Sequence, residues 1–408
     1  MSSGTLIFLI AGEPSGDRLG ADLMDSLKKN QDVRFMGIGG EAMKAEGLNS
    51  LFPMEELSLM GIFSILRDLP NLLRRLRYTV KTIQEVKPEM VITIDSPDFS
   101  FRVMKRLHKL PSRPKLVHYV APTVWAWRPG RARKIARFLD QLLCLYPFEP
   151  PLFEKHGLKS IFVGHPIASM TFKTRKRDPN LLCVLPGSRR SELKMLLPIF
   201  GKTVALVKKE IPNLKVIIPT LPALKESIEK QVKTWPVEAT IVEGEGKRNE
   251  AFERAYVALA ASGTVALQLA AARLPFVVAY SLGALSGKIA HVLIKIPYVC
   301  MVNILLGFEK LKKSSLRALQ MQGEAIHLND KAKKTAGLPR SLQDLAMTSN
   351  GWIPEYIQEN CQADKIARGL LQLFKDEKAR EAEVKAMGEA TDLLKAPSSE
   401  IKLSELVA

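Results

Sequence analysis

The sequence predicts an α/β fold with two doubly wound domains, each a parallel sheet covered by helices on both faces. Short apolar runs, turns rich in glycine or proline, and helical segments follow one another repeatedly, which is typical of βα units. A length of 408 residues suggests two domains rather than one. The polar and basic stretch Met170–Asn180 is interpreted as the linker between them.

The composition is that of a globular protein with excess positive charge. Hydrophobic residues make up 46% of the chain, and 60 Lys and Arg against 42 Asp and Glu give a net charge of +18. Such an excess favours nucleic acid, an anionic membrane surface or a phosphorylated substrate as partner, although no nucleic-acid-binding pattern accompanies it. No signal peptide or membrane span is expected. The four dispersed cysteines argue against zinc and disulfides and for a reducing cytoplasm.

In the first domain, Thr5–Ala11 is predicted as a strand, followed by the turn Gly12–Asp17 and a helix. The turn lacks the GxGxxG dinucleotide fingerprint. Its polar residues Glu13, Ser15 and Asp17 either face a ligand cleft or only shape the turn and cap the helix. A second strand leads into the glycine-rich loop Gly37–Gly40, which permits a close backbone approach.

Two carboxylates follow the predicted strand Met90–Ile94. Asp95 comes directly off the strand, where a general base would face a cleft, whereas Asp98 is the more natural helix cap. The preceding stretch Leu57–Leu76 is apolar, interrupted by Pro70 and basic at its end. It predicts either a helix that packs on the core or a surface that rests on a membrane or takes in acyl chains.

The loop after the predicted strand Lys115–Val120 contains Trp125, Trp127 and Arg128. These side chains could clamp a sugar or a lipid head group, or the loop could fold back onto the core. Leu142–Leu145 and Ser160–Val163 complete the predicted sheet. His165 follows the last strand and is either catalytic or structural.

The second domain opens with the strand Leu181–Leu185, the break Pro186-Gly187, and a helix start. Ser188 is the predicted N-cap, with Glu192 one position too far along for a strict capping box. Free N–H groups and the helix dipole form an anion site there, and Arg189 and its neighbour can grip a phosphate. An ordinary capped turn with solvated arginines is the alternative.

Further strands are predicted at Leu214–Pro219, Thr240–Val242, Val257–Ala260 and Phe276–Tyr280. The turn Ala261–Thr264 has small residues that allow a helix N-terminus to meet a pyrophosphate, or simply allow close packing. Because the strands are parallel, both candidate phosphate loops are expected at the same edge of the sheet. The segment Phe308–Gly351 is interpreted as an insertion, and Ile357–Leu394 as helical.

Six motifs in series closely resemble the lipid-A-disaccharide synthase family over nearly the whole chain. They are AGEPSGD (Ala11–Asp17), TIDSPDF (Thr93–Phe99), VWAWR (Val124–Arg128), GHP (Gly164–Pro166), LPGSR (Leu185–Arg189) and ASGT (Ala261–Thr264). The resemblance implies a GT-B fold of two Rossmann-like domains that face a central cleft, with C-terminal helices. We place these at residues 1–170 (acceptor), 171–360 (donor) and 361–408 (helices and tail).

The resemblance also implies a reaction. The family transfers 2,3-diacylglucosamine from its UDP-linked form to 2,3-diacylglucosamine 1-phosphate, forming a β-1,6-linked disaccharide and releasing UDP. Its members are peripheral to the cytoplasmic face of the inner membrane, because both substrates carry acyl chains, and they can exchange C-terminal segments in a homodimer. No cofactor, metal or nucleic acid is expected.

Site residues carry over position by position. Asp95 matches the proposed base for the acceptor's 6-hydroxyl, and Glu13 matches a cleft acid of the first domain; both are expected to be catalytic. The expected substrate-binding residues are Arg189 and Asn303 at the donor phosphates, Ser262, Gly263 and Thr264 in the nucleotide loop, and Ser188, Met195, Gln268, Trp125 and Arg128. An inverting transfer needs such a base, and the departing UDP needs cationic and N–H donors.

The sequence departs from the family pattern at three places. Gln268 stands where related proteins often carry a Glu that holds the ribose hydroxyls, and Ser169 replaces an Asp. The segment Phe308–Gly351 separates two stretches that the family joins almost directly. A UDP-sugar enzyme with another lipid acceptor and a non-catalytic anion-binding protein are the alternative functions.

Overall fold

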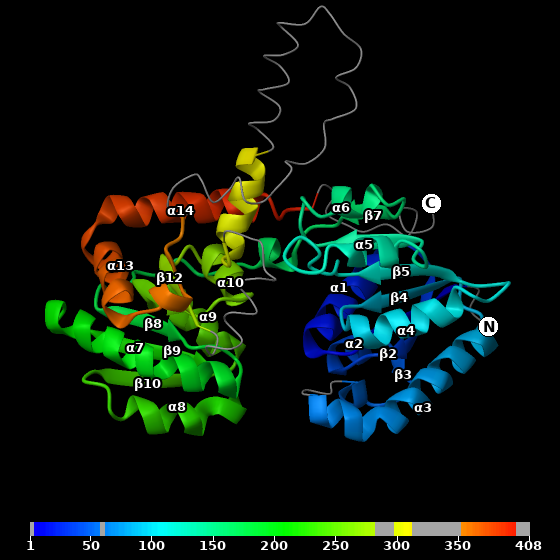
Figure 1. Cartoon of the computed structure of the whole chain (residues 1–408), viewed down its shortest axis with the longest axis horizontal. Coiled ribbons are helices and arrows are strands. Elements are labelled where there is room, and N and C mark those ends of the chain that lie inside the picture. Colours follow the sequence, from blue (N-terminus) through cyan, green and yellow to red (C-terminus); the bar gives the residue numbers. More distant parts are fainter. Residues whose placement is uncertain (1–3, 58–61, 282–297, 312–351, 397–408) are drawn as a thin grey trace, which may run out of the picture. The chain divides into compact units, whose positions relative to one another are not determined.

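The computed structural model describes residues 4–57, 62–281, 298–311 and 352–396. The chain divides into two compact units, Met1–Pro166 with Lys395–Ala408, and Ile167–Leu394 (Figure 1). Each unit contains a parallel sheet with helices on both faces, which confirms the predicted fold class. The domain limits 1–170, 171–360 and 361–408 stay a prediction. Among the described helices, none is both long and apolar enough to cross a membrane.

The first unit is built on a seven-stranded sheet of order β3-β2-β1-β4-β5-β6-β7. Its strands are β1 (Thr5–Ala11), β2 (Val33–Ile38), β3 (Asn49–Ser50), β4 (Met90–Ile94), β5 (Lys115–Tyr119), β6 (Gln141–Cys144) and β7 (Lys159–Phe162). All neighbouring strands pair in parallel. From β1 the chain adds β2 and β3 on one side of the sheet, and it then adds β4 to β7 on the other side.

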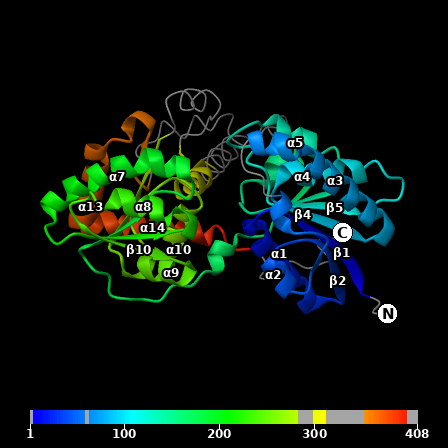
Figure 2. The same cartoon turned by 90° about the horizontal axis from the view of Figure 1, so that it is seen from below.

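Alternate side chains of these strands enter two separate cores. Ile7 and Leu9 pack with the helices α1 (Pro14–Asn30) and α2 (Glu41–Ala45). Phe8 and Ile10 pack on the other face, which is covered by α3 (Ile62–Val86), α4 (Pro97–Leu107), α5 (Gly130–Ile135) and α6 (Pro150–Glu154). Figure 2 shows the two groups of helices on opposite sides of the strands. Burial on both faces explains why these strands are nearly continuous apolar runs.

Helix α3 corrects one prediction. Pro70 does not interrupt the segment but lies inside the helix, where it is exposed. A proline removes one helical hydrogen bond, and on an exposed face water can satisfy the carbonyl that loses its partner. Leu76 of this segment and Ile83 further along α3 are buried in the core, whereas Arg74 and Arg77 are exposed, and contact with a membrane or acyl chains stays a prediction. Residues 58–61 lie outside the described residues.

The second unit has a six-stranded parallel sheet of order β10-β9-β8-β11-β12-β13. Its strands are β8 (Leu181–Leu185), β9 (Lys215–Thr220), β10 (Glu238–Glu243), β11 (Val257–Ala260), β12 (Phe276–Tyr280) and β13 (Glu355–Ile357). The first five confirm the predicted strands within a few residues. Strand β13 was not predicted, because three half-buried residues at a sheet edge leave no apolar run in the sequence.

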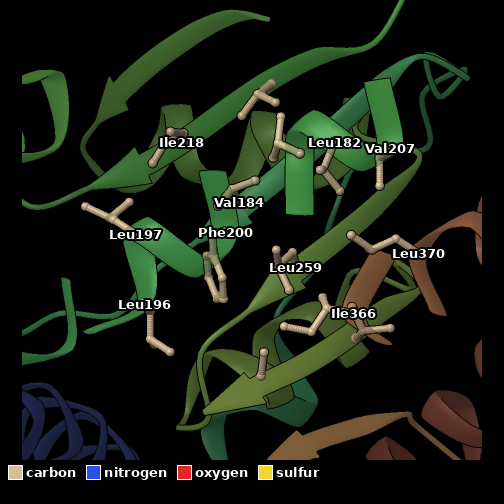
Figure 3. Close-up of a cluster of buried hydrophobic side chains, with 14 of the residues drawn as sticks. Leu182, Val184, Leu196, Leu197, Phe200, Val207, Ile218, Leu259, Ile366 and Leu370 are labelled. Atoms are coloured by element: carbon tan, nitrogen blue, oxygen red, sulfur yellow. The ribbon is translucent and has the colours of Figure 1, made fainter. Parts of the chain in front are cut away.

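Helices cover both faces of this sheet as well. They are α7 (Arg190–Glu210), α8 (Lys225–Val232), α9 (Glu245–Arg254), α10 (Val265–Ala271), α13 (Ala363–Lys375), α14 (Glu377–Asp392) and a helix at residues 301–311. Phe200 of α7 and Ile366 of α13 pack on Val184 and Leu259 in one core (Figure 3). Helices α13 and α14 confirm the predicted C-terminal helices. Of the predicted insertion, residues 312–351 lie outside the described residues.

The stretch interpreted as a linker is bound to the second unit. The guanidinium of Arg177 donates hydrogen bonds of 2.7–3.2 Å to four backbone carbonyls, those of Phe252, Ala255, Ala272 and Arg273. The backbone N–H of Lys173 donates to Glu253. The polar segment therefore satisfies backbone carbonyls near the C-terminal ends of α9 (Glu245–Arg254) and α10 (Val265–Ala271), because one arginine offers five donors.

Candidate active site

The first group of candidate residues lies where the first sheet reverses its winding. Ala11 at the end of β1 and Ile94 at the end of β4 are partners in the parallel ladder. The two following loops therefore leave the same edge side by side, and their helices α1 and α4 go to opposite faces. Ligands of doubly wound sheets bind at such a switch point. This topology brings Asp95 next to the turn that contains Glu13.

Contacts between these loops are close. A Cβ on Gly12 would lie 2.6 Å from the Ser96 hydroxyl, so the glycine permits the approach. Asp95 (φ +53°) and Ser96 (φ +42°) both adopt left-handed backbone conformations, which are uncommon for residues other than glycine. Burial raises the pKa of Asp95, and hydrogen bonds from the Ser96 backbone and the Ser15 side chain partly oppose the rise. A raised pKa makes the carboxylate a better proton acceptor.

The acids of the first turn separate into two kinds. Asp17 is buried and accepts hydrogen bonds from the N–H groups of Gly40, Ala42 and Met43 at 2.7–3.1 Å. Asp17 therefore fixes the glycine-rich loop and the start of α2, so its role is structural rather than that of a ligand-facing acid. Glu13 is exposed at the N-cap position of α1. Asp98 is exposed in the first turn of α4, whose N-cap is Ser96 rather than Asp98.

The tryptophan loop divides in the same way. The indole N–H of Trp125 donates to the Glu149 carboxylate at 3.2 Å, and its ring packs edge-on against Tyr146 and Phe148. Trp125 therefore folds back onto the core, which is one of the two predicted arrangements. Trp127 is 44% exposed, and the guanidinium of Arg128 lies 4.1 Å from its ring centroid. His165 packs against Tyr146, with a pKa lowered to about 4 by burial. Binding of substrate by Trp125 and Arg128 stays a prediction.

Glu149 is a residue that sequence reasoning missed. It is 1% exposed and accepts hydrogen bonds from Trp125 and the Tyr146 backbone, yet burial raises its pKa to about 8. The sequence signal is a lone acid among aromatic and proline residues directly after a predicted strand, in the stretch LYPFEP (residues 145–150). Glu149 ties the tryptophan loop to the loop after β6.

Glu149→Gln is expected to stabilise the protein increasingly as pH rises. The pKa of this acid rises from 4.5 to about 8 on folding, so the folded state holds the proton more tightly. Its contribution to stability is full below about pH 4.5 and declines as pH rises to about 8. Gln mimics the neutral acid and removes this decline. Urea unfolding at pH 5 and pH 8.5 measures the free energy of unfolding of variant and wild type. The control is Glu154→Gln, which changes an exposed acid. A stability difference between Glu149→Gln and wild type that does not depend on pH would contradict the assignment.

The second group of residues lies at the switch point of the second sheet. Leu185 at the end of β8 and Ala260 at the end of β11 are ladder partners, and the Ala261 N–H donates to the Leu185 carbonyl at 2.8 Å. The two predicted phosphate loops therefore leave neighbouring strands from matched positions. The prediction that they share one edge of the sheet is confirmed.

The first of these loops has a different cap from the predicted one. Helix α7 begins at Arg190, so Arg189 and not Ser188 is the N-cap, and Glu192 occupies the capping-box position. The Glu192 carboxylate accepts hydrogen bonds from the N–H groups of Ser188 at 2.9 Å and Arg189 at 3.2 Å. Gly187 has φ +111° and packs on Glu192, where a Cβ would not fit. The Arg189 side chain is 69% exposed, although it also contacts Glu192 at 3.3 Å.

The second loop is open at its tip. Gly263 has φ +154°, and a Cβ there would meet no atom within 4 Å. Thr264 is exposed, and Ser262 is half-buried with its hydroxyl donating to the Val299 carbonyl at 3.2 Å. Gln268 lies one turn into α10 and is half-buried, while Met195 of α7 is 38% exposed. These residues are accessible, but contact with a donor stays a prediction.

Asn303 differs from the expectation of direct phosphate contact. It is fully buried, its amide nitrogen donates to the Ile353 carbonyl and Glu355, and its oxygen accepts from the Ile353 N–H. With these bonds made, the side chain joins the helix at residues 301–311 to Ile353 and Glu355, and direct contact with a donor phosphate stays a prediction. In the part of the chain that the structure describes, no cluster of three or more His, Cys, Asp or Glu could hold a metal ion.

Comparison with known proteins decides the family. Residues 7–337 match the family model described as lipid-A-disaccharide synthetase. The lipid-A-disaccharide synthase of Rhodospirillum centenum is 43% identical over 397 residues, covering 94% of this chain and 88% of that protein. That of Ruegeria pomeroyi is 44% identical, covering 73% and 79%.

The chain belongs to the lipid-A-disaccharide synthase family. It is therefore a glycosyltransferase of lipid A biosynthesis, as the resemblance implied. A solved structure supports the fold alone: a putative UDP-N-acetylglucosamine 2-epimerase from Listeria monocytogenes aligns with a TM-score of 0.57 and 10% identity, covering 96% of this chain and 94% of that chain.

Proposed function

We propose that this lipid-A-disaccharide synthase family member transfers 2,3-diacylglucosamine from UDP-2,3-diacylglucosamine to the 6-hydroxyl of 2,3-diacylglucosamine 1-phosphate. The products are the β-1,6-linked disaccharide 1-phosphate and UDP. The observation that carries the proposal is Asp95, an acid of raised pKa at the switch point of the first sheet. A single base that activates one hydroxyl for attack opposite the leaving group gives inversion at the anomeric carbon.

The second unit supplies the complementary chemistry in this proposal. As the bond to UDP breaks, negative charge grows on the diphosphate, and preorganised donors there lower the barrier. Arg189 offers an exposed guanidinium, and at the same sheet edge Ser262, Gly263 and Thr264 offer backbone N–H donors and Thr264 also a hydroxyl. Asn303 contributes indirectly in this proposal, because its side-chain amide bonds to Ile353 and Glu355.

Gln268→Glu is expected to tighten UDP binding about threefold to tenfold. A carboxylate accepts from ribose hydroxyls in a charge-assisted hydrogen bond, which is about twice as strong as the neutral bond that an amide makes. Isothermal titration with UDP and with uridine measures it, and both ligands should gain, because both carry the ribose. A gain with neither would remove Gln268 from the ribose site.

The surroundings of the reaction are also part of the proposal. Because donor and acceptor both carry acyl chains, we place the enzyme at the cytoplasmic face of the inner membrane as a peripheral protein. A homodimer with exchanged C-terminal segments is the proposed assembly, to be checked by light scattering. The +18 net charge suits an anionic bilayer surface.

Product analysis tests the proposal. The purified protein is incubated with both acylated substrates, and the lipid product is identified by mass spectrometry and its linkage by NMR. A β-1,6 disaccharide 1-phosphate is the expected result. A different acylated product would retain the glycosyltransferase but replace the acceptor, and UDP binding without any product would favour an anion-binding protein.

A further inference from the structure

Glu355 is a carboxylate of the second unit to which neither the family motifs nor the proposed mechanism gives a role. It is the first residue of β13 and lies beside β12. Its two oxygens accept hydrogen bonds from the Val299 N–H at 2.8 Å, the Cys300 N–H at 3.1 Å and the Asn303 side-chain amide at 2.7 Å. Three donors thus converge on one largely buried acid.

These donors belong to the start of a helix. Residues 301–311 are helical, so the N–H groups of Val299 and Cys300 lie at its entrance, where a negative charge is favourable. Asn303, in the first turn, is fixed to Glu355 and to both backbone groups of Ile353. The carboxylate therefore fixes the entrance of this helix to the edge of the sheet.

The same peptide segment reaches the nucleotide loop. Val299 donates its N–H to Glu355, while its carbonyl accepts the hydroxyl of Ser262 at 3.2 Å. A chain of hydrogen bonds thus runs from Glu355 through Val299 to Ser262, the residue before Gly263. Gly263 is exposed and a Cβ there would meet no atom within 4 Å, so the hydroxyl of Ser262 is a point at which this open loop is attached to the rest of the unit.

We propose that Glu355 is a positioning residue that holds the Ser262–Thr264 loop in its nucleotide-binding conformation through the Val299 peptide. This proposal rests on the proposed function, because it assigns the loop to the UDP moiety of the donor. The proposal also gives Asn303 a role, because the side chain of Asn303 bonds to Glu355 and Ile353 in the same network. Glu355 touches no substrate; it acts by keeping the Ser262 anchor in place.

The experiment measures UDP binding to the full chain by isothermal titration calorimetry. Glu355→Gln is expected to raise the Kd for UDP about tenfold, since mutations along a hydrogen-bonded network change coupling to a distant ligand by such amounts. The matched control is Glu383→Gln, another buried acid of this unit, which accepts from the Phe276 N–H at 3.0 Å and lies in α14. It should leave the Kd unchanged, whatever it does to thermal stability.

A double-mutant cycle with Ser262→Ala tests the route. If Glu355 acts through Ser262, the double variant should bind UDP no more than about twofold more weakly than the weaker single variant. Should Glu355→Gln fail to fold, Glu355→Asp, which keeps the charge but retracts it by one methylene group, replaces it in the same cycle.

The outcomes separate the two proposals. An unchanged Kd in Glu355→Gln, or an equal loss in Glu383→Gln, overturns the positioning role while leaving the proposed function intact. Additive effects of the Glu355 and Ser262 changes overturn the route through Val299. A wild-type protein that does not bind UDP overturns the proposed function and this inference together.

Discussion

Asp95→Asn is expected to lower the transfer rate by about 10²- to 10⁴-fold, the range that a positioned general base contributes. The amide keeps the size of the side chain but cannot take the proton from the acceptor hydroxyl. Because Asp95 belongs to the first unit and the proposed UDP site to the second, the Kd for UDP should stay within about twofold. Single-turnover kinetics and calorimetry measure the two effects separately.

Asp98→Asn is the matched control for this change. Asp98 lies three residues further along the chain, in the first turn of α4, where its side chain is exposed, whereas Asp95 is half-buried. Its removal should leave turnover within about twofold. Normal turnover in Asp95→Asn, or an equal loss in both variants, would show that Asp95 is not the base.

Arg189→Ala is expected to weaken UDP binding by about 1.5–3 kcal/mol, the range for a hydrogen bond to a charged group. The guanidinium is 69% exposed at the start of α7 and could bind two phosphate oxygens at once. Its weak contact with Glu192 at 3.3 Å offers little competition. Affinity for uridine, which has no phosphate, should not change.

Lys194→Ala controls for net charge, because Lys194 is an exposed cation one turn further along the same helix. It should reduce UDP affinity by less than about 0.5 kcal/mol, since exposed charges beyond a direct contact are screened. If both variants lose affinity equally, the effect is one of general charge. Uridine affinity lost along with UDP affinity would instead point to a disturbed loop.

The two sheets were predictable because their strands are buried on both faces. Runs such as Met90–Ile94 and Leu181–Leu185 have no reason to be apolar throughout except to serve as central parallel strands. Strand β13 carries no such pattern, since it is short and lies at an edge. Pro70 is predicted to break the helix because proline removes a helical hydrogen bond, yet α3 continues through this exposed position.

The candidate site was predictable to the level of loops but not of side chains. Order along the chain places Asp95 and Arg189 after central strands, and topology then places both at switch points. Packing decides which acids are buried. Asp17 accepts hydrogen bonds from three backbone N–H groups, and Glu149 accepts one from the indole of Trp125. Nothing local distinguishes Asp17 from Glu13 in the turn that they share.

Hydrogen bonds between distant segments were the least accessible to sequence reasoning. Asn303 matches a family position, yet its amide is committed to Ile353 and Glu355, some fifty residues away in the chain. The shift of the N-cap from Ser188 to Arg189 has a similar cause. Glu192 already accepts the N–H of Ser188, so the helix begins one residue later than the residue types suggest.

The most direct test of the account is UDP release by the purified protein from UDP-2,3-diacylglucosamine, with and without 2,3-diacylglucosamine 1-phosphate. The account predicts rapid release that requires the acceptor and is lost in Asp95→Asn. Release at the same rate without the acceptor, or binding of UDP with no acceptor-dependent release, would contradict it.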